Sequence, residues 1–102
     1  MVEQGNNPSL SEILGIKDFP AKQRKAIEII DTITISPEQK TLLFFYHLWH
    51  ESGTIAPVKR LTGIKNNSDA LSLIGKVLES DELVEHYDSF YKQYRLSYRN
   101  DD

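Results

Sequence analysis

Apolar residues recur at helical spacing in the first half of the chain. Residues 20–33 read PAKQRKAIEIIDTI, and Ile27, Ile30 and Ile33 fall on one side of a helix drawn from this segment. Residues 37–52 are apolar over much of a helix circumference, which is typical of a helix in the middle of a domain. A shorter helix is predicted before them over residues 9–16.

Strong boundary signals frame the apolar helix. Ser36 stands before Pro37, and Gln39 follows three residues after the serine, which is the pattern of a capping box with proline at the first helical position. The helix is predicted to end at Gly53.

The segment after Gly53 contains proline and glycine at short intervals, which predicts short elements. Residues 54–55 could form a brief strand, and a helix of about two turns is predicted from Pro57 to Gly63. A turn then leads into a helix over residues 69–80. The inward stripe of that last helix is predicted to consist of Leu71, Ile74 and Leu78.

The C-terminal segment holds four of the five tyrosines in the stretch HYDSFYKQYRLSYR. Residues 81–87 and 91–98 are predicted to be two strands around the turn 88–90, with Tyr94, Leu96 and Tyr98 on the buried side. The expected fold is therefore mainly α with a small β-hairpin, a winged helix-turn-helix with extra N-terminal helices. One domain over 9–102 is expected, with 9–34 as dimerisation helices, 36–99 as the winged helix-turn-helix, and 1–8 disordered.

Residues as well as element order carry a family resemblance. LIGKVLESDELVEHY resembles the segment of ArsR-, MarR- and PadR-type winged-helix regulators in which the recognition helix leads into the wing, with DELV in place of the usual glycine form. YKQYRLS is similar to the returning wing strand. Small dimeric proteins of this build include TubR-like plasmid-partition proteins, which bind centromere repeats. The resemblance implies a sequence-specific DNA-binding homodimer, either a repressor or a partition adaptor.

The residues themselves suit DNA recognition. Asparagine can contact adenine through two hydrogen bonds, and a serine hydroxyl can contact bases or phosphate. The same Asn-Asn-Ser cluster also suits an ordinary turn and helix cap. The predicted phosphate contacts are Lys59, Arg60 and Lys65; the base-edge candidates are Asn66, Asn67, Ser68, Ser72 and Lys76; and the wing would supply Lys92, Gln93 and Arg95.

Charge is distributed unevenly. The whole chain carries a net charge of −3, which argues against an indiscriminate nucleic-acid coat. Residues 54–78 hold four basic side chains and one acidic side chain, a net of +3; residues 79–88 hold five acidic side chains and no lysine or arginine, a net of −5. Residues 89–99 return to +3. A local basic face can bind phosphate even on an acidic chain.

Other kinds of site find little support. The chain has no cysteine, so disulfides and thiolate metal sites are excluded. His47, His50 and Glu51 could share a helix face around zinc, but the spacing is not HExxH and a third ligand is missing. No catalytic set and no glycine-rich phosphate loop is present, so neither an enzyme nor a cofactor is expected. No apolar run approaches membrane length, no signal peptide is evident, and a cytoplasmic location is expected.

The apolar stripe of isoleucines in residues 20–33 is expected to be buried against another surface. It could pack on helix 37–52 within one chain, or on its copy in a homodimer; the homodimer through Ile27, Ile30 and Ile33 is favoured, because a two-fold dimer presents two recognition helices to DNA. A segregation motor would be a further partner in a partition role. The main alternative is a protein–protein interaction module without DNA binding. A single-strand stacking platform built on the C-terminal tyrosines ranks lower.

Overall fold

The computed structural model describes residues 10–14 and 20–101, except the side chains of residues 11 and 98–101. The segment 1–8, predicted to be disordered, lies outside these ranges. Six helices make up the described part, and it contains no strand. They are α1 (Leu10–Leu14), α2 (Ala21–Asp31), α3 (Pro37–Ser52), α4 (Ala56–Thr62), α5 (Asn67–Leu78) and α6 (Asp81–Asp101).

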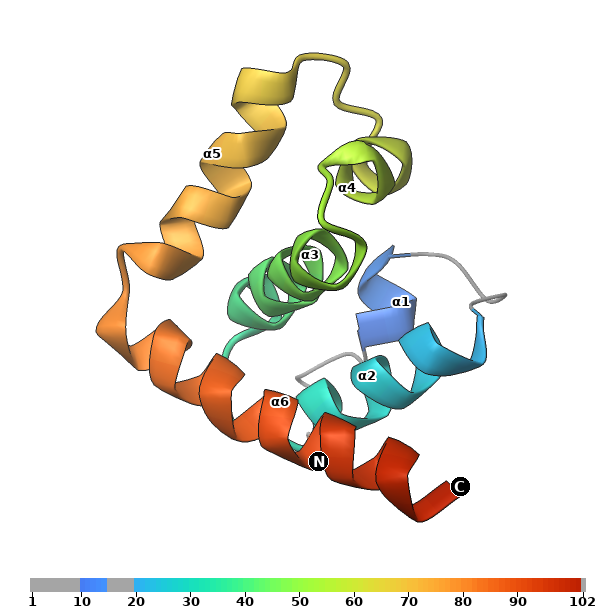
Figure 1. Ribbon diagram of the computed structural model, residues 1–102. Coiled ribbons are helices and arrows are strands. Elements are labelled where there is room, and N and C mark those ends of the chain that lie inside the picture. Colours follow the sequence, from blue (N-terminus) through green and yellow to red (C-terminus); the bar gives the residue numbers. More distant parts are fainter. Residues whose placement is uncertain (1–9, 15–19, 102) are drawn as a thin grey trace.

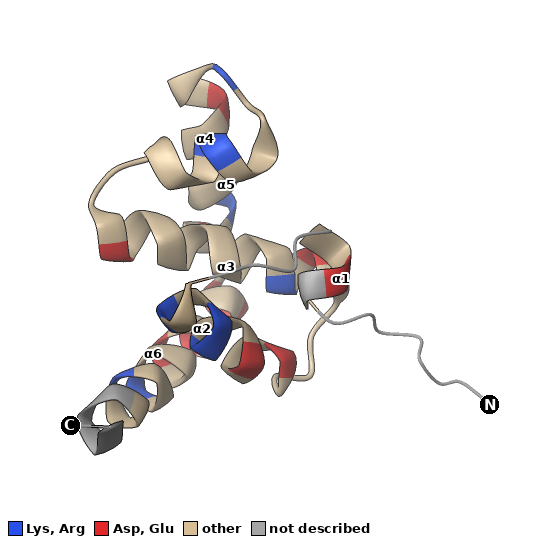
Figure 2. Cartoon of the chain, turned by 90° about the vertical axis from the view of Figure 1, so that its right-hand side faces the viewer, with Lys and Arg blue, Asp and Glu red and all other residues tan. Residues whose placement is uncertain are grey.

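Helix α3 lies at the centre of the molecule and contacts all five other helices. In Figure 1 it is seen nearly end-on, with α1 and α2 on one side, α4 and α5 on the other, and α6 running below. The quarter turn of Figure 2 places α4 and α5 above α3 and places α2 and α6 below it. The apolar circumference predicted for this helix is explained by its central position.

The predicted ends of α3 and α4 are confirmed. The Ser36 hydroxyl accepts from the Gln39 backbone N–H at 3.2 Å, and the Gln39 side chain accepts from the Ser36 N–H at 3.0 Å. Gly53 and Gly63 end α3 and α4 with φ of 73° and 79°, a left-handed conformation that a side chain disfavours. Residues 54 and 55 form a bend and not the predicted strand.

The predicted β-hairpin wing is wrong, because residues 81–101 form the single helix α6. Among the side chains of α6 that the structure describes, the four buried ones are Leu83, Tyr87, Phe90 and Tyr94, at successive spacings of four, three and four residues. This is the period of a helix and not of a strand. The alternation expected of a strand also fails at Leu96, which is 55% exposed although a strand would place it on the buried side.

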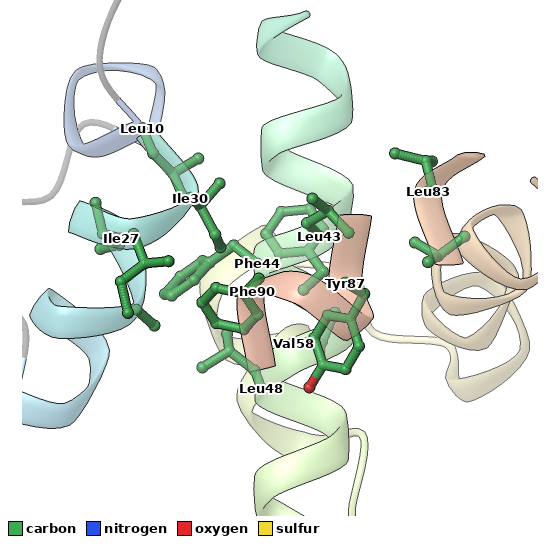
Figure 3. Packing of buried hydrophobic residues seen from close by; sticks show 14 of the residues in the cluster. Leu10, Ile27, Ile30, Leu43, Phe44, Leu48, Val58, Leu83, Tyr87 and Phe90 are labelled. Carbon is green, nitrogen blue, oxygen red and sulfur yellow. The ribbon is translucent and has the colours of Figure 1, made fainter. Parts of the chain in front are cut away.

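The core contains side chains from α2, α3, α5 and α6, with Leu10 from α1 and Val58 from α4 (Figure 3). Ile27 and Ile30 are 5% and 0% exposed, and Ile33 packs against the same cluster. The isoleucine stripe is therefore covered within one chain, which is the intrachain alternative. A homodimer stays a prediction, and it would need a surface other than this stripe.

The buried face of α5 is rotated relative to the predicted one. Ala70, Ile74 and Val77 are buried, whereas Leu71 and Leu78 are 45% and 54% exposed. Ile74 was correctly predicted to face inward, but the two leucines flank the interface with α3. Because α5 packs closely on α3 and the small Ala70 lies at that contact, the bulkier leucines are left towards solvent.

A polar junction ties the first three helices together. Oδ1 of Asp31 accepts from the Leu10 backbone N–H at 2.9 Å and lies 3.5 Å from Nζ of Lys40. The Lys40 side chain is only 7% exposed and that of Asp31 is 25% exposed. The carboxylate at the end of α2 thus holds α1 and compensates a buried charge on α3.

Candidate functional site

Helices α4 and α5 are two short helices joined by a tight turn over residues 63–66 and packed on α3. Gly63 reverses the chain, and Asn66 then caps α5 by accepting from the Ser68 backbone N–H at 2.7 Å. The three helices α3, α4 and α5 contact one another in pairs. The turn and this packing set α5 with one face on α3 and the other face towards solvent.

The outward face of α5 is polar. Ser68, Ser72 and Lys76 lie opposite the buried Ala70 and Ile74, and all three are exposed. The Ser72 hydroxyl donates to the Ser68 carbonyl at 3.1 Å, so its oxygen keeps acceptor capacity towards solvent. We call Asn66, Asn67, Ser68, Ser72 and Lys76, together with Lys59, Arg60 and Lys65, the α4–α5 surface.

Positive charge gathers at the start of α5. Arg60 and Lys65 are exposed, whereas Lys59 is half-buried and its Nζ donates to Oδ1 of Asn67 at 2.6 Å. The Asn67 carbonyl oxygen is therefore already engaged within the chain. Its amide N–H₂ keeps two donors, so Asn67 is a weaker candidate for a two-bond contact to adenine than the exposed serines.

Acidic residues lie mainly at the other end of α5. The segment 79–88 with its net charge of −5 begins where α5 ends, and twelve helical residues rise about 18 Å along the axis. Figure 2 shows lysine and arginine on α4 and the following turn, at the end of the molecule away from α6. Asp69 is the exception, an exposed carboxylate in the first turn of α5.

The residues assigned to the wing lie on α6, because no hairpin is present to carry them. Lys92, Gln93 and Arg95 are exposed there. Lys92 pairs with Asp88 one turn earlier at 3.3 Å, and the Arg95 guanidinium lies 5.8 Å from the centre of the Tyr91 ring. These three side chains therefore belong to a helix that, within the described part of the chain, does not contact α4.

A second feature is a cluster of aromatic rings between the end of α3 and the middle of α6. The His47 ring meets the Phe90 ring at 5.1 Å and the Tyr94 ring at 4.7 Å, both edge to face. Glu51 accepts from the hydroxyls of Tyr91 and Tyr94 at 3.2 Å and 3.5 Å. The carboxylate is therefore positioned by two tyrosines across the α3–α6 interface.

Burial alters the acid–base chemistry of this cluster. His47 is 2% exposed, and desolvation lowers its pKa from 6.5 to about 4, although Glu51 acts in the opposite direction. Burial raises the pKa of the Tyr87 hydroxyl, and the Glu51 carboxylate adds to that shift. Nδ1 of His47 and the hydroxyl of Tyr87 have no hydrogen-bond partner among the described residues.

A pocket of about 230 Å³ opens beside His47, where α2, α3, α4 and α6 meet. Its lining combines apolar and polar side chains: Lys22, Gln23, His47, Leu48, Glu51, Ser52, Pro57 and Tyr94. Sequence reasoning did not find this pocket, because its residues come from four separate segments. The one available signal was the histidine within an otherwise apolar run, which indicated only a metal ligand.

The suggested zinc set does not assemble. Within residues 10–14 and 20–101, no three histidine, aspartate or glutamate side chains come together in a way that could hold a metal ion. His47 is buried among rings, whereas His50 is exposed and its Nδ1 lies 3.9 Å from Glu51. The two histidines thus occupy different environments, although they share one helix.

No family model, curated protein or solved structure matches this chain. The likeness to ArsR-, MarR- and PadR-type regulators therefore rests on the quoted residues alone. No helix in the described part of the chain is long and apolar enough to cross a membrane.

Proposed function

We propose that this chain binds double-stranded DNA sequence-specifically, with α5 in the major groove and α4 against the phosphate backbone. The observation that supports this most is the composition of the outward face of α5. Ser68, Ser72 and Lys76 are exposed on one side of a helix whose other side is anchored to α3. Hydroxyl and ammonium groups on an exposed helix face are the groups that contact base edges and phosphates.

The charges favour one orientation on the duplex. Arg60 and Lys65 flank the start of α5 and would meet phosphates on either side of the groove. The acidic segment 79–88 lies at the other end of α5, so an approach through the N-terminal end of the helix keeps it away from the backbone. Asp69 would then accept from the amino group of a cytosine.

A pair of substitutions tests this role. Ser72→Ala removes a base-edge candidate, so it should lose about 1 kcal/mol or more of preference for a selected cognate site over random duplex. Lys65→Ala should weaken cognate and random duplexes equally and reduce the salt slope by about 1. Lys92→Ala removes the same type of charge from α6 and is the matched control, which should leave binding unchanged.

The measurement is fluorescence anisotropy at several salt concentrations, using duplexes selected from a random pool. Equal losses on cognate and random DNA for Ser72→Ala would remove its base-reading role. A Lys92→Ala effect as large as that of Lys65→Ala would place DNA on a different face. No binding by the wild-type chain at low salt would refute the proposal as a whole.

The biological role that we propose is transcriptional repression or the marking of a plasmid centromere, acting as a homodimer. A two-fold dimer would hold two copies of α5 about 34 Å apart, one turn of DNA, and would select inverted or repeated half-sites. A motor gene beside the coding sequence, with repeated sites upstream, would favour partition and a segregation motor as partner. The distance between the two protected half-sites in a footprint of the upstream DNA tests this spacing of the two α5 helices.

One observation favours the alternative of a protein-binding module. Leu71 and Leu78 stand one above the other on α5, both about half exposed, and form an apolar stripe beside the polar face. If this stripe binds a protein, Leu71→Ser should abolish partner binding and leave DNA affinity unchanged. The same variant would lower DNA affinity if Leu71 packs on thymine methyl groups.

A further inference from the structure

The pocket beside His47 has the size and the chemistry of a site for a small molecule. An engineered apolar cavity of about 150 Å³ holds benzene, and each water in the liquid occupies about 30 Å³. At about 230 Å³ the pocket suits a single ring with a short side chain. It lies outside the α4–α5 surface, so a ligand could bind there whether or not the chain binds DNA.

One wall of the pocket is apolar, formed by Leu48, Pro57 and the ring of Tyr94. The lining also contains the Glu51 carboxylate, whose two oxygens accept from Tyr91 and Tyr94. A carboxylate has about four acceptor sites, so these two bonds leave capacity for a further donor. Because the two tyrosines already fix the carboxylate, a ligand that binds it pays a smaller entropic cost for ordering this side chain.

His47 is the second titratable side chain of the lining that matters for the charge of a ligand. It lines the pocket and is 2% exposed, yet its Nδ1 has no partner among the described residues. Because the ring is neutral at neutral pH, it adds no positive charge that would oppose a cation at Glu51.

We propose that this pocket binds a compact organic amine, with the ammonium at Glu51 and an apolar body against Leu48 and Pro57. The ring of Tyr94 would add a cation–π contribution. Lys22 is the one cation among the lining residues, and it is exposed on the first turn of α2, where solvent screens its charge. An anionic ligand would instead have to overcome the repulsion of Glu51.

Two small molecules of similar shape and opposite charge test whether the pocket prefers a cation or an anion. Phenethylamine and 3-phenylpropionate carry the same ring on a two-carbon chain, one with an ammonium and the other with a carboxylate. Titration of the ¹⁵N-labelled full chain should give saturable amide shifts at Gln23 and Ser52 with phenethylamine. The ring-nitrogen resonances of His47 should shift with the same dissociation constant, which a purely surface association would not produce.

Glu51→Gln keeps the shape of the side chain and removes its charge, and it should weaken phenethylamine binding about tenfold or more. Glu85→Gln, an exposed carboxylate on α6 outside the pocket lining, is the matched control and should leave the affinity unchanged. Thermal unfolding of both variants checks that they fold. If either variant fails to fold, the comparison of the two probes on the wild-type chain still tests the proposal.

The proposal is overturned if phenethylamine gives only shifts that grow linearly with concentration. It is also overturned if 3-phenylpropionate binds equally or better, since Lys22 and not Glu51 would then select the charge. Equal losses for Glu51→Gln and Glu85→Gln would show general attraction of a cation to an acidic chain. Each of these results leaves the DNA-binding proposal untouched, because none of them involves the α4–α5 surface.

Discussion

Ser89→Pro distinguishes a continuous α6 from the hairpin that the sequence first indicates. Ser89 lies eight residues after the start of the helix, is exposed, and occupies the middle of the supposed turn 88–90. In a helix interior, proline removes one backbone hydrogen bond and its ring clashes with the carbonyl four residues earlier. In a tight turn, the same residue would be tolerated.

The expected loss in the free energy of unfolding is about 3 kcal/mol or more. It is a lower bound, because the kink falls between Tyr87 and Phe90, which are 8% and 0% exposed and anchor α6 to the core. For a domain of about this size, 3 kcal/mol corresponds to a fall in Tm of roughly 12–24 °C. Since the Ser89 side chain is exposed, little of this loss comes from side-chain packing.

Urea unfolding followed by far-UV circular dichroism measures the change, with Ser89→Ala as the control. Alanine should stabilise the chain by about 0.5 kcal/mol or less, because it favours helix over serine. A proline variant within about 1 kcal/mol of the wild type would refute the continuous helix and restore the hairpin. A loss confined to proline, with alanine neutral or stabilising, is the result expected for α6.

Two further predictions concern stability. The folded-state pKa of His47, about 4, lies below the unfolded value of 6.5, so folding favours the neutral ring. This contribution to the free energy of unfolding is complete above pH 6.5 and is lost as the pH falls towards 4, by about 3 kcal/mol. His47→Phe should therefore reduce the difference in the free energy of unfolding between pH 7 and pH 4, measured by urea titration. The same pH dependence in the two proteins would contradict this. Ser36→Ala removes the cap of α3 and should cost about 1 kcal/mol in the free energy of unfolding, measured with urea. The same change at the exposed, non-capping Ser89 of α6 is not expected to destabilise, and equal effects of the two changes would contradict the role of the cap.

Helix ends that depend on local chemistry could be predicted from the sequence. Ser36 with Gln39, and the glycines at 53 and 63, form their caps with neighbours no more than four residues away. No tertiary information is needed for such contacts, which explains why the ends of α3 and α4 could be predicted, although the brief strand expected at 54–55 is absent.

The prediction for the C-terminal segment was wrong for a different reason. Over seven residues, alternation and helical spacing give similar patterns, and division at 88–90 hid the continuous stripe from Leu83 to Tyr94. The supposed turn also lacks glycine, proline and asparagine, so its chemistry argued against a hairpin. A scan across the division would have found the helical period.

The candidate sites show the same division between local and tertiary information. The structure places Ser68, Ser72 and Lys76 together on the exposed face of α5. The spacing of Leu71, Ile74 and Leu78 predicts an inward stripe, but only Ile74 of the three is buried. How closely two helices approach decides that choice, and the sequence does not state it. The pocket depends wholly on tertiary contacts, since its lining comes from α2, α3, α4 and α6.

The junction at Asp31 has a consequence for how this chain can change during evolution. If Lys40 is replaced first by an apolar residue, Asp31 is still partly solvated and still accepts from the Leu10 N–H. If Asp31 is lost first, the ammonium of Lys40 stays buried without its counter-charge. The two substitutions are therefore not interchangeable in order, and an accessible mutational path passes through the loss of the lysine before that of the aspartate.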